Sequence, residues 1–499
     1  MTVKDIKNAL KHLPKGSEAL NHAYAEAIER IQAQPQEYQE LAKRVISWIT
    51  LAQRPLSVLE LRHALAVEID RSDLDDENLI ETEDLLSGCA GLVVIDDESG
   101  IIRLVHYTAQ EYFQRLLPLW NPDAHPEIVK ICIAYLSFDV FAVGPTVSGL
   151  VMDERIQGNL LLSYAATYWS YHYRHTSDQG LDRSVLHFFE KTLNLQCVSE
   201  IYMSSVSECS LASDTALHAA ALYGLPEIAA LLLANGHPPD LAGAAECTPL
   251  MMAALVGQAK VADMLASRDD VDKNVRNPLF RTPLSYAAEY GHGGVVEILA
   301  QRADVDAEAG DFRGQPPLCY AAAGGHEEVV RILMQRDDIN ANARDQDGMT
   351  ALFYAASHGH ESTVRYLLQR DDVDAGARDN PGRIALHLAA GGGHEGIVKL
   401  LIEDQNIKAD VVDESGWSPL MYATGGGHSE VVEYLARRDD VNVNKEANDG
   451  STALDYKHGN GFNVVGDVLK RHGALTKAEL EAGRAQSPSL PNLTELSVF

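Results

Sequence analysis

Histidines recur at a regular spacing in the second half of the chain, and a glycine precedes each of them. They are His292, His326, His360, His394 and His428, one in every 34 residues. Imidazole is a frequent metal ligand and general base. Stacked repeats would hold neighbouring imidazoles roughly 10 Å apart, however, which is too far for two of them to share a metal ion. We therefore expect each histidine to stabilise a turn through a hydrogen bond.

Other patterns that carry catalysis or bind cofactors are absent from the sequence. It contains no Gly-x-x-x-x-Gly-Lys phosphate loop, no Gly-x-Ser-x-Gly nucleophile elbow and no His-Glu-x-x-His motif. The six cysteines form no Cys-x-x-Cys pair. Trp169, His172 and His175 share one predicted helix, where we expect a packing role. The sequence predicts a protein that is not an enzyme and that has no cofactor or metal site; a cryptic hydrolase is the alternative from another functional class.

The elements that position the recurring residues are eight copies of one pattern. In six copies a Thr or Ser precedes a short helix, whereas Pro316 and Ile384 stand there in the other two, so those two helix starts are weaker. Six of the helices carry an Ala pair, a Gly ends each helix, and a second apolar helix follows. We call the loops between the helical pairs fingers. This period predicts a stack of helical pairs with projecting fingers. The anchor leucines of the eight copies are Leu217, Leu250, Leu284, Leu318, Leu352, Leu386, Leu420 and Leu454.

The fifth copy shows the frame most completely. It runs from 344 to 352 and continues with Ala355-Ala356, Gly359-His360 and Leu367-Leu368. This frame resembles the ankyrin repeat, and the resemblance covers residues 207–475. It implies a solenoid that binds a protein through its concave face and its fingers. The first and eighth copies depart from the pattern, which indicates capping units.

Finger residues and the ends of the first helices are the predicted partner-binding positions. In ankyrin-like arrays these positions have no packing role, so apolar groups there have nothing to bury against except a partner. A tolerated loop residue without a partner is the alternative interpretation for each of them. The predicted partner-binding residues are Leu279, Arg281, Tyr290, Phe312, Arg313, Met349, His358, Arg383 and Trp417.

One tyrosine column lies at a constant position of the frame. Met252 and Leu388 replace tyrosine in two copies. Because these aliphatic residues substitute for tyrosine, a half-buried framework ladder is favoured over an aromatic cage. The column consists of Tyr286, Tyr320, Tyr354, Tyr422 and Tyr456.

Residues 1–120 show three predicted helices and a β-hairpin around the turn 96–100, which together indicate a winged helix. The blocks 54–56, 64–67, 89–93 and 102–108 resemble the winged-helix segment that follows the ATPase in fungal NACHT and ankyrin proteins, which are NLR-like proteins of the STAND class. Residues 121–206 resemble the helical connector of those proteins. The ATPase module of the family has no counterpart in the sequence, so the resemblance implies no nucleotide switch here.

The net charge is −31, and more than half of it lies in 207–475. Residues 1–120 hold 12 basic and 20 acidic groups, which argues against DNA binding by the winged helix. An acidic surface repels nucleic acid and anionic membranes and attracts basic protein segments. Residues 1–16 lack the continuous apolar stretch of a secretory signal, and no apolar run of the sequence reaches the length of a membrane span. We expect a cytoplasmic protein, with the nucleus as the alternative compartment.

The sequence thus predicts a mainly α chain of four parts. A winged helix (1–120) and a helical connector (121–206) precede eight ankyrin-like repeats (207–475), and a short helix with a disordered tail follows (476–499). The predicted function is a non-catalytic interaction scaffold or sensor for a protein or peptide of basic character. An adaptor or regulatory subunit of a larger enzyme or transcription complex is the alternative. The oligomeric state does not follow from the sequence.

Overall fold

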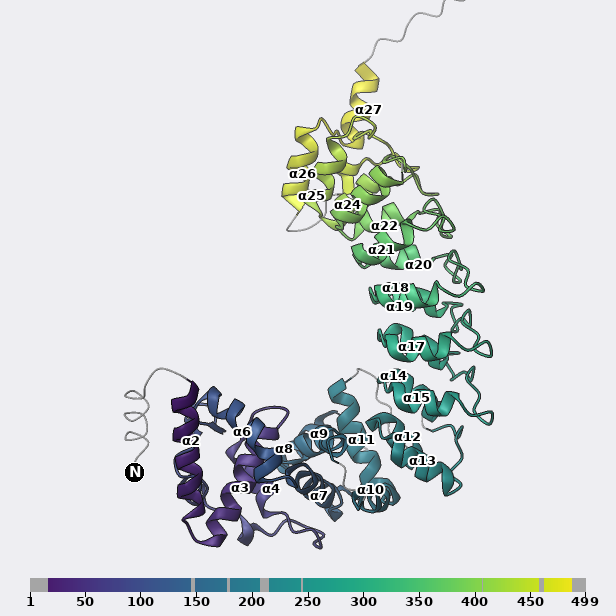
Figure 1. Ribbon diagram of the computed structural model, residues 1–499. Coiled ribbons are helices and arrows are strands. Elements are labelled where there is room, and N and C mark those ends of the chain that lie inside the picture. The colour runs from purple at the N-terminus through teal and green to yellow at the C-terminus, as the bar shows by residue number, and fades with distance from the viewer. Residues whose placement is uncertain are drawn as a thin grey trace, which may run out of the picture. The chain divides into compact units, whose positions relative to one another are not determined.

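The computed structural model describes residues 17–144, 149–176, 180–206, 215–243, 246–405, 407–456 and 462–486 (Figure 1). The chain divides into two compact units, Met1–Pro249 and Leu250–Phe499. The first unit combines a helical domain that carries a small sheet with a helical connector and the first repeat. The second unit contains the other repeats. Both units are mainly helical, as the sequence predicts.

The N-terminal domain has the winged-helix arrangement. Helix α3 lies at its centre and contacts α2, α4, α5, α6 and strand β3. The apolar spacing of α3 buries Val45, Ile46 and Trp48. Ser57 begins α4 with a capping box, in which its hydroxyl accepts from the Glu60 N–H and the Glu60 carboxylate accepts from the Ser57 N–H. The helices are α2 (Ser17–Gln32), α3 (Gln36–Leu51), α4 (Val58–Ala66), α5 (Thr82–Gly88) and α6 (Tyr107–Trp120).

The predicted hairpin forms, and a third strand joins it. Strands β2 (Val93–Ile95) and β3 (Ile101–Leu104) pair antiparallel, with Val93 opposite Leu104. Gly100 has φ +67° and closes the turn between them. The two-residue strand β1 (Leu56–Ser57) pairs with the other edge of β3, so the order is β1-β3-β2. Strand β1 was not predicted from the sequence, because a two-residue strand shows no alternation.

The connector is helical and packs on the first repeat within the first unit. Trp169 of α9 is fully buried, and its ring lies 5.0 Å from that of Tyr223 in the repeat and 6.3 Å from that of Phe188 in the connector. This packing role for Trp169 is the predicted one. The helices are α7 (Ala124–Leu136), α8 (Gly149–Gly158), α9 (Leu162–Arg174), α10 (Leu181–Glu190), α11 (Thr192–Val206), and in the repeat α12 (Ala216–Tyr223) and α13 (Pro226–Ala234).

In the second unit the first helices of successive repeats stack on one another, and the second helices form a parallel row. Figure 1 shows the fingers projecting from one edge of this stack. The first helices are α14 (Pro249–Leu255), α16 (Pro283–Glu289), α18 (Pro317–Ala323), α20 (Ala351–Ser357), α22 (Ala385–Gly391) and α24 (Pro419–Gly426). The second helices are α15 (Ala259–Ala266), α17 (Gly293–Ala300), α19 (Glu327–Leu333), α21 (Glu361–Leu368), α23 (Glu395–Lys399) and α25 (Ser429–Ala436).

The last repeat differs from the others. A 3-10 turn (Ala453–Tyr456) occupies the place of its first helix, and α26 (Phe462–Arg471) and α27 (Lys477–Gln486) follow. A π-helical turn (Leu400–Asp404) extends α23. Residues 457–458, where the eighth copy has Lys-His in place of the Ala pair, and the predicted tail after residue 486 lie outside the described residues. The predicted boundary between residues 206 and 207 stays a prediction.

The predicted signals at the helix ends are partly realised. Thr215 and Thr282 cap their helices through the side-chain oxygen, whereas Thr350 and Ser418 make no such bond. Every predicted glycine after a first helix that is described has a left-handed φ, between +65° and +79°. Among the described residues, no helix is long and apolar enough to cross a membrane.

Candidate interaction surface

The recurring histidines join neighbouring repeats. The Nε2–H of each ring donates to a main-chain carbonyl 37 residues earlier, at 2.7–3.1 Å. The acceptors are the carbonyls of Leu255, Glu289, Ala323, Ser357 and Gly391. The predicted hydrogen bond exists, but it links one repeat to the repeat before it instead of closing the histidine's own turn. Each histidine therefore satisfies a carbonyl at the end of the preceding first helix.

The glycine that ends each first helix makes room for this histidine. A Cβ atom added to Gly325 would lie 2.4 Å from Nδ1 of His360, and one added to Gly359 would lie 2.5 Å from Nδ1 of His394. These glycines also have φ of +69° and +79°. The glycine and the histidine of adjacent repeats therefore form one structural contact.

In five successive fingers a polar side chain at the base, Asn277, Asp311, Asp345, Asp379 or Asp413, closes the finger turn. Asp311 is typical, because its Oδ1 accepts from the N–H groups of Arg313 and Gln315, both at 2.8 Å. Its Oδ2 accepts from the Tyr320 hydroxyl at 2.8 Å. The tyrosine column is thus a framework ladder, as favoured above. The hydroxyls of Tyr354 and Tyr422 donate in the same way to Asp345 and Asp413, whereas the Tyr286 hydroxyl accepts from Nδ2 of Asn277.

The finger tips are linked by a backbone ladder. The N–H of a tip residue donates to a carbonyl in the preceding finger, from Phe312 to Leu279 at 3.1 Å and from Gln346 to Arg313 at 2.8 Å. The same bond continues from Asn380 to Asp347 at 3.0 Å. Each tip is therefore held by its neighbour, and together the tips form a continuous edge of the second unit.

Four of the predicted partner-binding residues are accessible at this edge or beside the helix ends. Leu279 and Phe312 are each 51 % exposed, and Arg313 is exposed next to Phe312. The Arg313 guanidinium lies 5.5 Å from the centre of the Phe312 ring. His358 is exposed at the end of α20. The backbone ladder brings Leu279, Phe312 and Arg313 together, whereas His358 is at a helix end in another repeat.

Arg281 is not a free finger residue, which corrects the expectation that this position has no packing role. It is only 9 % exposed. Its guanidinium lies 4.2 Å from the ring centres of both Tyr286 and Tyr320 and forms a 2.7 Å ion pair with Glu289. The planar guanidinium stacks between two aromatic rings, and the carboxylate of Glu289 balances its charge. Arg281 supports the finger instead of presenting a charge to a partner.

Two further predicted residues also take part in internal contacts. Trp417 is half-buried, and its ring lies 4.2 Å from that of Tyr456 and 5.4 Å from that of Tyr422. Nε of Arg383 donates to Asp379 at 2.7 Å, because Leu388 replaces the tyrosine that would otherwise bond to this carboxylate. The expectation of free side chains is therefore wrong for Trp417 and Arg383 as well.

Met349 and Tyr290 are both half-buried. The Tyr290 ring stacks on His292 with a centroid distance of 6.3 Å. These two residues are partly accessible, but neither lies among the exposed tip residues near Leu279 and Phe312. Whether they contact a partner stays a prediction.

Phe280 is a tip residue that the sequence analysis missed. It is 52 % exposed and has φ +58°, in the left-handed region that disfavours residues with a Cβ. The signal was present in the sequence, because glycine occupies the same position of the frame in the five following fingers. These glycines are Gly314, Gly348, Gly382, Gly416 and Gly450.

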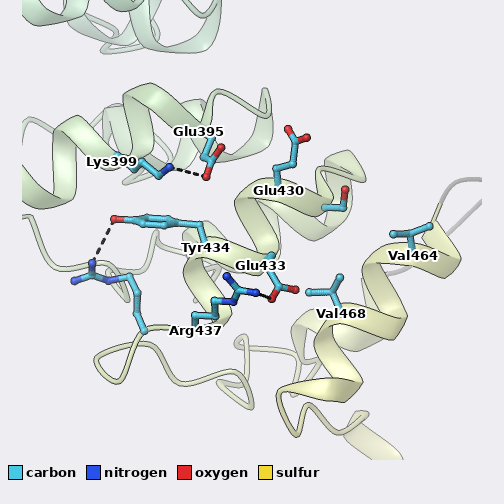
Figure 2. Close-up of a pocket in the computed structure, with 10 residues that line it drawn as sticks. Glu395, Lys399, Glu430, Glu433, Tyr434, Arg437, Val464 and Val468 are labelled. Atoms are coloured by element: carbon cyan, nitrogen blue, oxygen red, sulfur yellow. Dashed lines mark hydrogen bonds and ion pairs between the residues drawn. The ribbon is translucent and has the colours of Figure 1, made fainter.

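A surface groove lies away from the finger edge, between the second helices α23 and α25 and helix α26. It is an open groove of about 630 Å³, and Figure 2 shows Tyr434 beside it, with Val464 and Val468 on α26. The charged groups that line it pair internally, from Lys399 to Glu395 at 2.8 Å and from Arg437 to Glu433 at 2.6 Å (Figure 2). These paired charges leave the groove without a converging set of reactive groups.

Buried titratable groups are present away from the finger edge. His172 of α9 is fully buried, and its Nδ1 lies 3.0 Å from that of His125 and its Nε2 2.9 Å from the Tyr164 hydroxyl. Burial lowers the pKa of His172 to about 3 and that of His387 in α22 to about 4, so both imidazoles are neutral at pH 7. In the described part of the chain, no group of three His, Cys, Asp or Glu residues is arranged to hold a metal ion.

Comparisons with known proteins agree with this architecture. A family model described as GPI inositol-deacylase, winged helix domain, matches residues 29–116. No curated protein matches the chain. A model of ankyrin repeats in three copies matches residues 181–277, 217–311, 284–379 and 371–447. These matches begin within the connector and together cover more than half of the chain, which therefore belongs to the ankyrin-repeat family.

Proposed function

We propose that the chain is a protein-interaction scaffold or sensor that binds a protein partner through the finger edge of the second unit. Ankyrin repeats indicate a protein-interaction role. The observation that carries the finer proposal is the linked row of finger tips, where Leu279, Phe280 and Phe312 expose about half of their surface. Exposed apolar side chains held on a rigid edge are typical of binding surfaces.

The charge of the repeats supports a protein partner. Residues 207–475 carry most of the net charge of −31, and this field would speed the approach of a partner with a basic surface. The same field repels the phosphates of nucleic acids and of anionic lipids. We therefore propose a partner that has basic character overall and that approaches the finger edge.

The winged helix and the connector support the sensor role in the proposal. Their order before the repeats resembles the sensor half of NACHT and ankyrin proteins, so we propose an NLR-like sensor role without a nucleotide switch for this chain. An adaptor or regulatory subunit is the alternative. It would use the same edge, and the identity of the bound partner distinguishes the two.

Site-specific photo-crosslinking in the native cell tests the proposal. A photoreactive amino acid would replace one tip residue at a time, at Phe312, Gln346 and Glu414, in the full chain. Val464 is the control position, because it is 60 % exposed and apolar but lies on α26, away from the fingers. We expect a protein adduct of defined mass from at least one tip position and none of that mass from position 464. Adducts from position 464 alone, or none at any tip, would overturn the proposed use of the finger edge.

A further inference from the structure

Four apolar residues lie together at the first two finger tips of the second unit. We call Pro278, Leu279, Phe280 and Phe312 the apolar tip. All four are exposed, and the main-chain bond from Phe312 to Leu279 joins the two fingers that carry them. Three of the four later fingers have polar side chains at both tip positions that correspond to Pro278 and Leu279, and the fourth has Asn380 followed by Pro381. The three polar pairs are Gln346 with Asp347, Glu414 with Ser415, and Asn448 with Asp449. The apolar tip is therefore a local feature and not a property of every repeat.

Phe280 retains a backbone conformation that a glycine would adopt at lower cost. Its φ of +58° lies where a Cβ meets the following carbonyl, and later fingers use glycine at this position. Its side chain gains little from burial, since half of it is exposed. The fold imposes the left-handed backbone on this position, in Glu246 of the preceding finger as well, but it does not require an exposed aromatic ring there, so the ring of Phe280 points to a role outside folding.

The apolar tip is rigid before any partner binds. Oδ1 of Asn277 accepts from the N–H groups of Leu279 and Arg281 at 3.0 and 2.9 Å. The Phe280 N–H donates to the Asn277 carbonyl at 2.7 Å, and the Arg281 guanidinium anchors the finger between two tyrosine rings. A pre-organised apolar surface loses little conformational entropy on binding.

The charge beside the apolar tip is opposite in sign to that of the whole array. The exposed guanidinium of Arg313 lies over Phe312, and Arg276 is exposed at the base of the same finger as Phe280. Arg276 has only a 4.0 Å contact with Asp306. Asp311, the carboxylate at the base of the finger that carries Phe312, is buried and bonded to Tyr320 and to backbone N–H groups. A carboxylate on a partner would therefore meet cations here.

We infer that the apolar tip docks an extended peptide segment of a partner protein in which aromatic or aliphatic side chains stand next to an acidic residue. This inference rests on the proposed function and adds the chemistry of the docked segment. The apolar side chains of the segment cover Leu279, Phe280 and Phe312, and its carboxylate pairs with Arg313. The rest of the partner keeps the basic character that suits the acidic array.

A displayed library of random 16-residue peptides, selected against the immobilised full chain, tests the inference. The selected peptides are then synthesised, and their Kd is measured for the native chain and for Phe280→Gly, Phe312→Ala and Arg313→Gln. Val464→Ala is the control, since it removes an equally exposed apolar side chain from α26. Melting temperatures of all variants are measured in parallel.

We expect selected peptides to be enriched in aromatic or aliphatic residues together with Asp or Glu. Phe280→Gly and Phe312→Ala raise the Kd by about tenfold or more, as at interface hot spots. Arg313→Gln raises it less and reduces its dependence on salt. Phe280→Gly keeps or raises the melting temperature, because glycine relieves the left-handed backbone. A lowered melting temperature would mean that Phe280 supports folding, which would overturn the argument from strain.

Other outcomes separate this inference from the proposed function. Peptides enriched in Lys or Arg, whose Kd is unchanged by Phe280→Gly and Phe312→Ala, would overturn the apolar and acidic specificity. Selection of no peptides would overturn it as well. The proposed function would then still stand or fall by the crosslinks from the finger edge. Peptides whose binding depends on Val464 alone would count against both.

Discussion

The first two finger tips of the second unit and the finger at 413–417 share one frame, but their aromatic residues differ in exposure. In the first two tips, Phe280 and Phe312 remain half exposed, and Phe280 adopts a strained backbone. In the finger at 413–417, Gly416 has the left-handed φ, and Trp417 packs against Tyr422 and Tyr456. An aromatic residue in a finger therefore indicates binding only where the next repeat does not cover it.

The difference has a local cause. Tyr456 follows Trp417 in the next repeat, and its tilted ring lies 4.2 Å from the Trp417 ring; Gly416 lies against the main chain of Asn448. Gly314 has more space, because the nearest atoms to a Cβ added there lie 3.8 Å away. Position 314 therefore has room for a side chain, whereas position 416 does not.

A bulky residue at the left-handed position of a late finger should give the largest loss of stability. In Gly416→Phe, the new Cβ would lie 2.8 Å from Oδ1 and 2.9 Å from the main-chain N of Asn448, in a backbone with φ +78°. Strain and overpacking together should lower the free energy of unfolding by about 4 kcal/mol. Urea denaturation measures this change. Gly314→Phe is the matched control and should cost about 1 to 2 kcal/mol, from the backbone alone; equal losses would remove the contrast between the tips.

The stability of the later repeats should also depend on pH. Burial lowers the pKa of His387 to about 4 from its ordinary value of 6.5. Between these values the unfolded chain takes up a proton that the folded chain does not, so stability is complete above pH 6.5 and falls toward pH 4, by about 3 kcal/mol for this group.

His387→Gln isolates this contribution. The amide can still accept from the Ile384 N–H, which bonds to Nδ1 of His387 at 3.0 Å, but it does not titrate. The difference in urea midpoint between the native chain and the variant should shrink as the pH falls from 7 to 4.5. A difference that stays constant over this range would contradict the neutral, buried state of His387.

Truncating the aromatic residue of each tip compares covered with uncovered side chains. Trp417→Ala should lower the free energy of unfolding by about 2 kcal/mol, because it removes two ring contacts from a half-buried site. Phe312→Ala should change it by about 0.5 kcal/mol or less, since half of that ring is in solvent. Thermal denaturation checks both values, and a large loss for Phe312→Ala would show that the apolar tip is a folding element.

Relieving the strain at the early tip should give a small gain in stability. Phe280→Gly removes a left-handed cost of about 1 to 2 kcal/mol, and the greater freedom of glycine in the unfolded chain offsets part of this gain. We expect a net stabilisation of about 1 kcal/mol or less, seen as a higher urea midpoint. Phe280→Ala keeps the Cβ and should show no such gain.

Much of the fold could be predicted from the sequence, because its signals are periodic and local. The spacing of Leu217 and its counterparts predicted the paired helices, and the Asp-rich turn at 96–100 predicted the hairpin. Helix α2 was not predicted. Its place depends on distant contacts, such as the 2.7 Å bond between the hydroxyl groups of Tyr24 and Thr108. Contacts of this kind leave no pattern in a single stretch of sequence.

The candidate site was less predictable, because exposure depends on neighbours in the next repeat. Arg281 and Trp417 have residue types that suit a binding surface, yet tyrosines from the frame cover both. Phe280 could have been found, because it replaces a glycine at a constant position. What the sequence could not show is that the main chain brings Phe280, Leu279 and Phe312 to one edge.

The crosslinking yield at two equivalent tip positions tests the account most directly. Phe312 and Glu414 occupy the same position of the frame, three repeats apart. With the photoreactive residue placed at one or the other in the full chain, the partner adduct should form from position 312 and be weak or absent from position 414. An adduct of the same partner that forms equally from both positions, or only from 414, would contradict the claim that the apolar tip is the docking site.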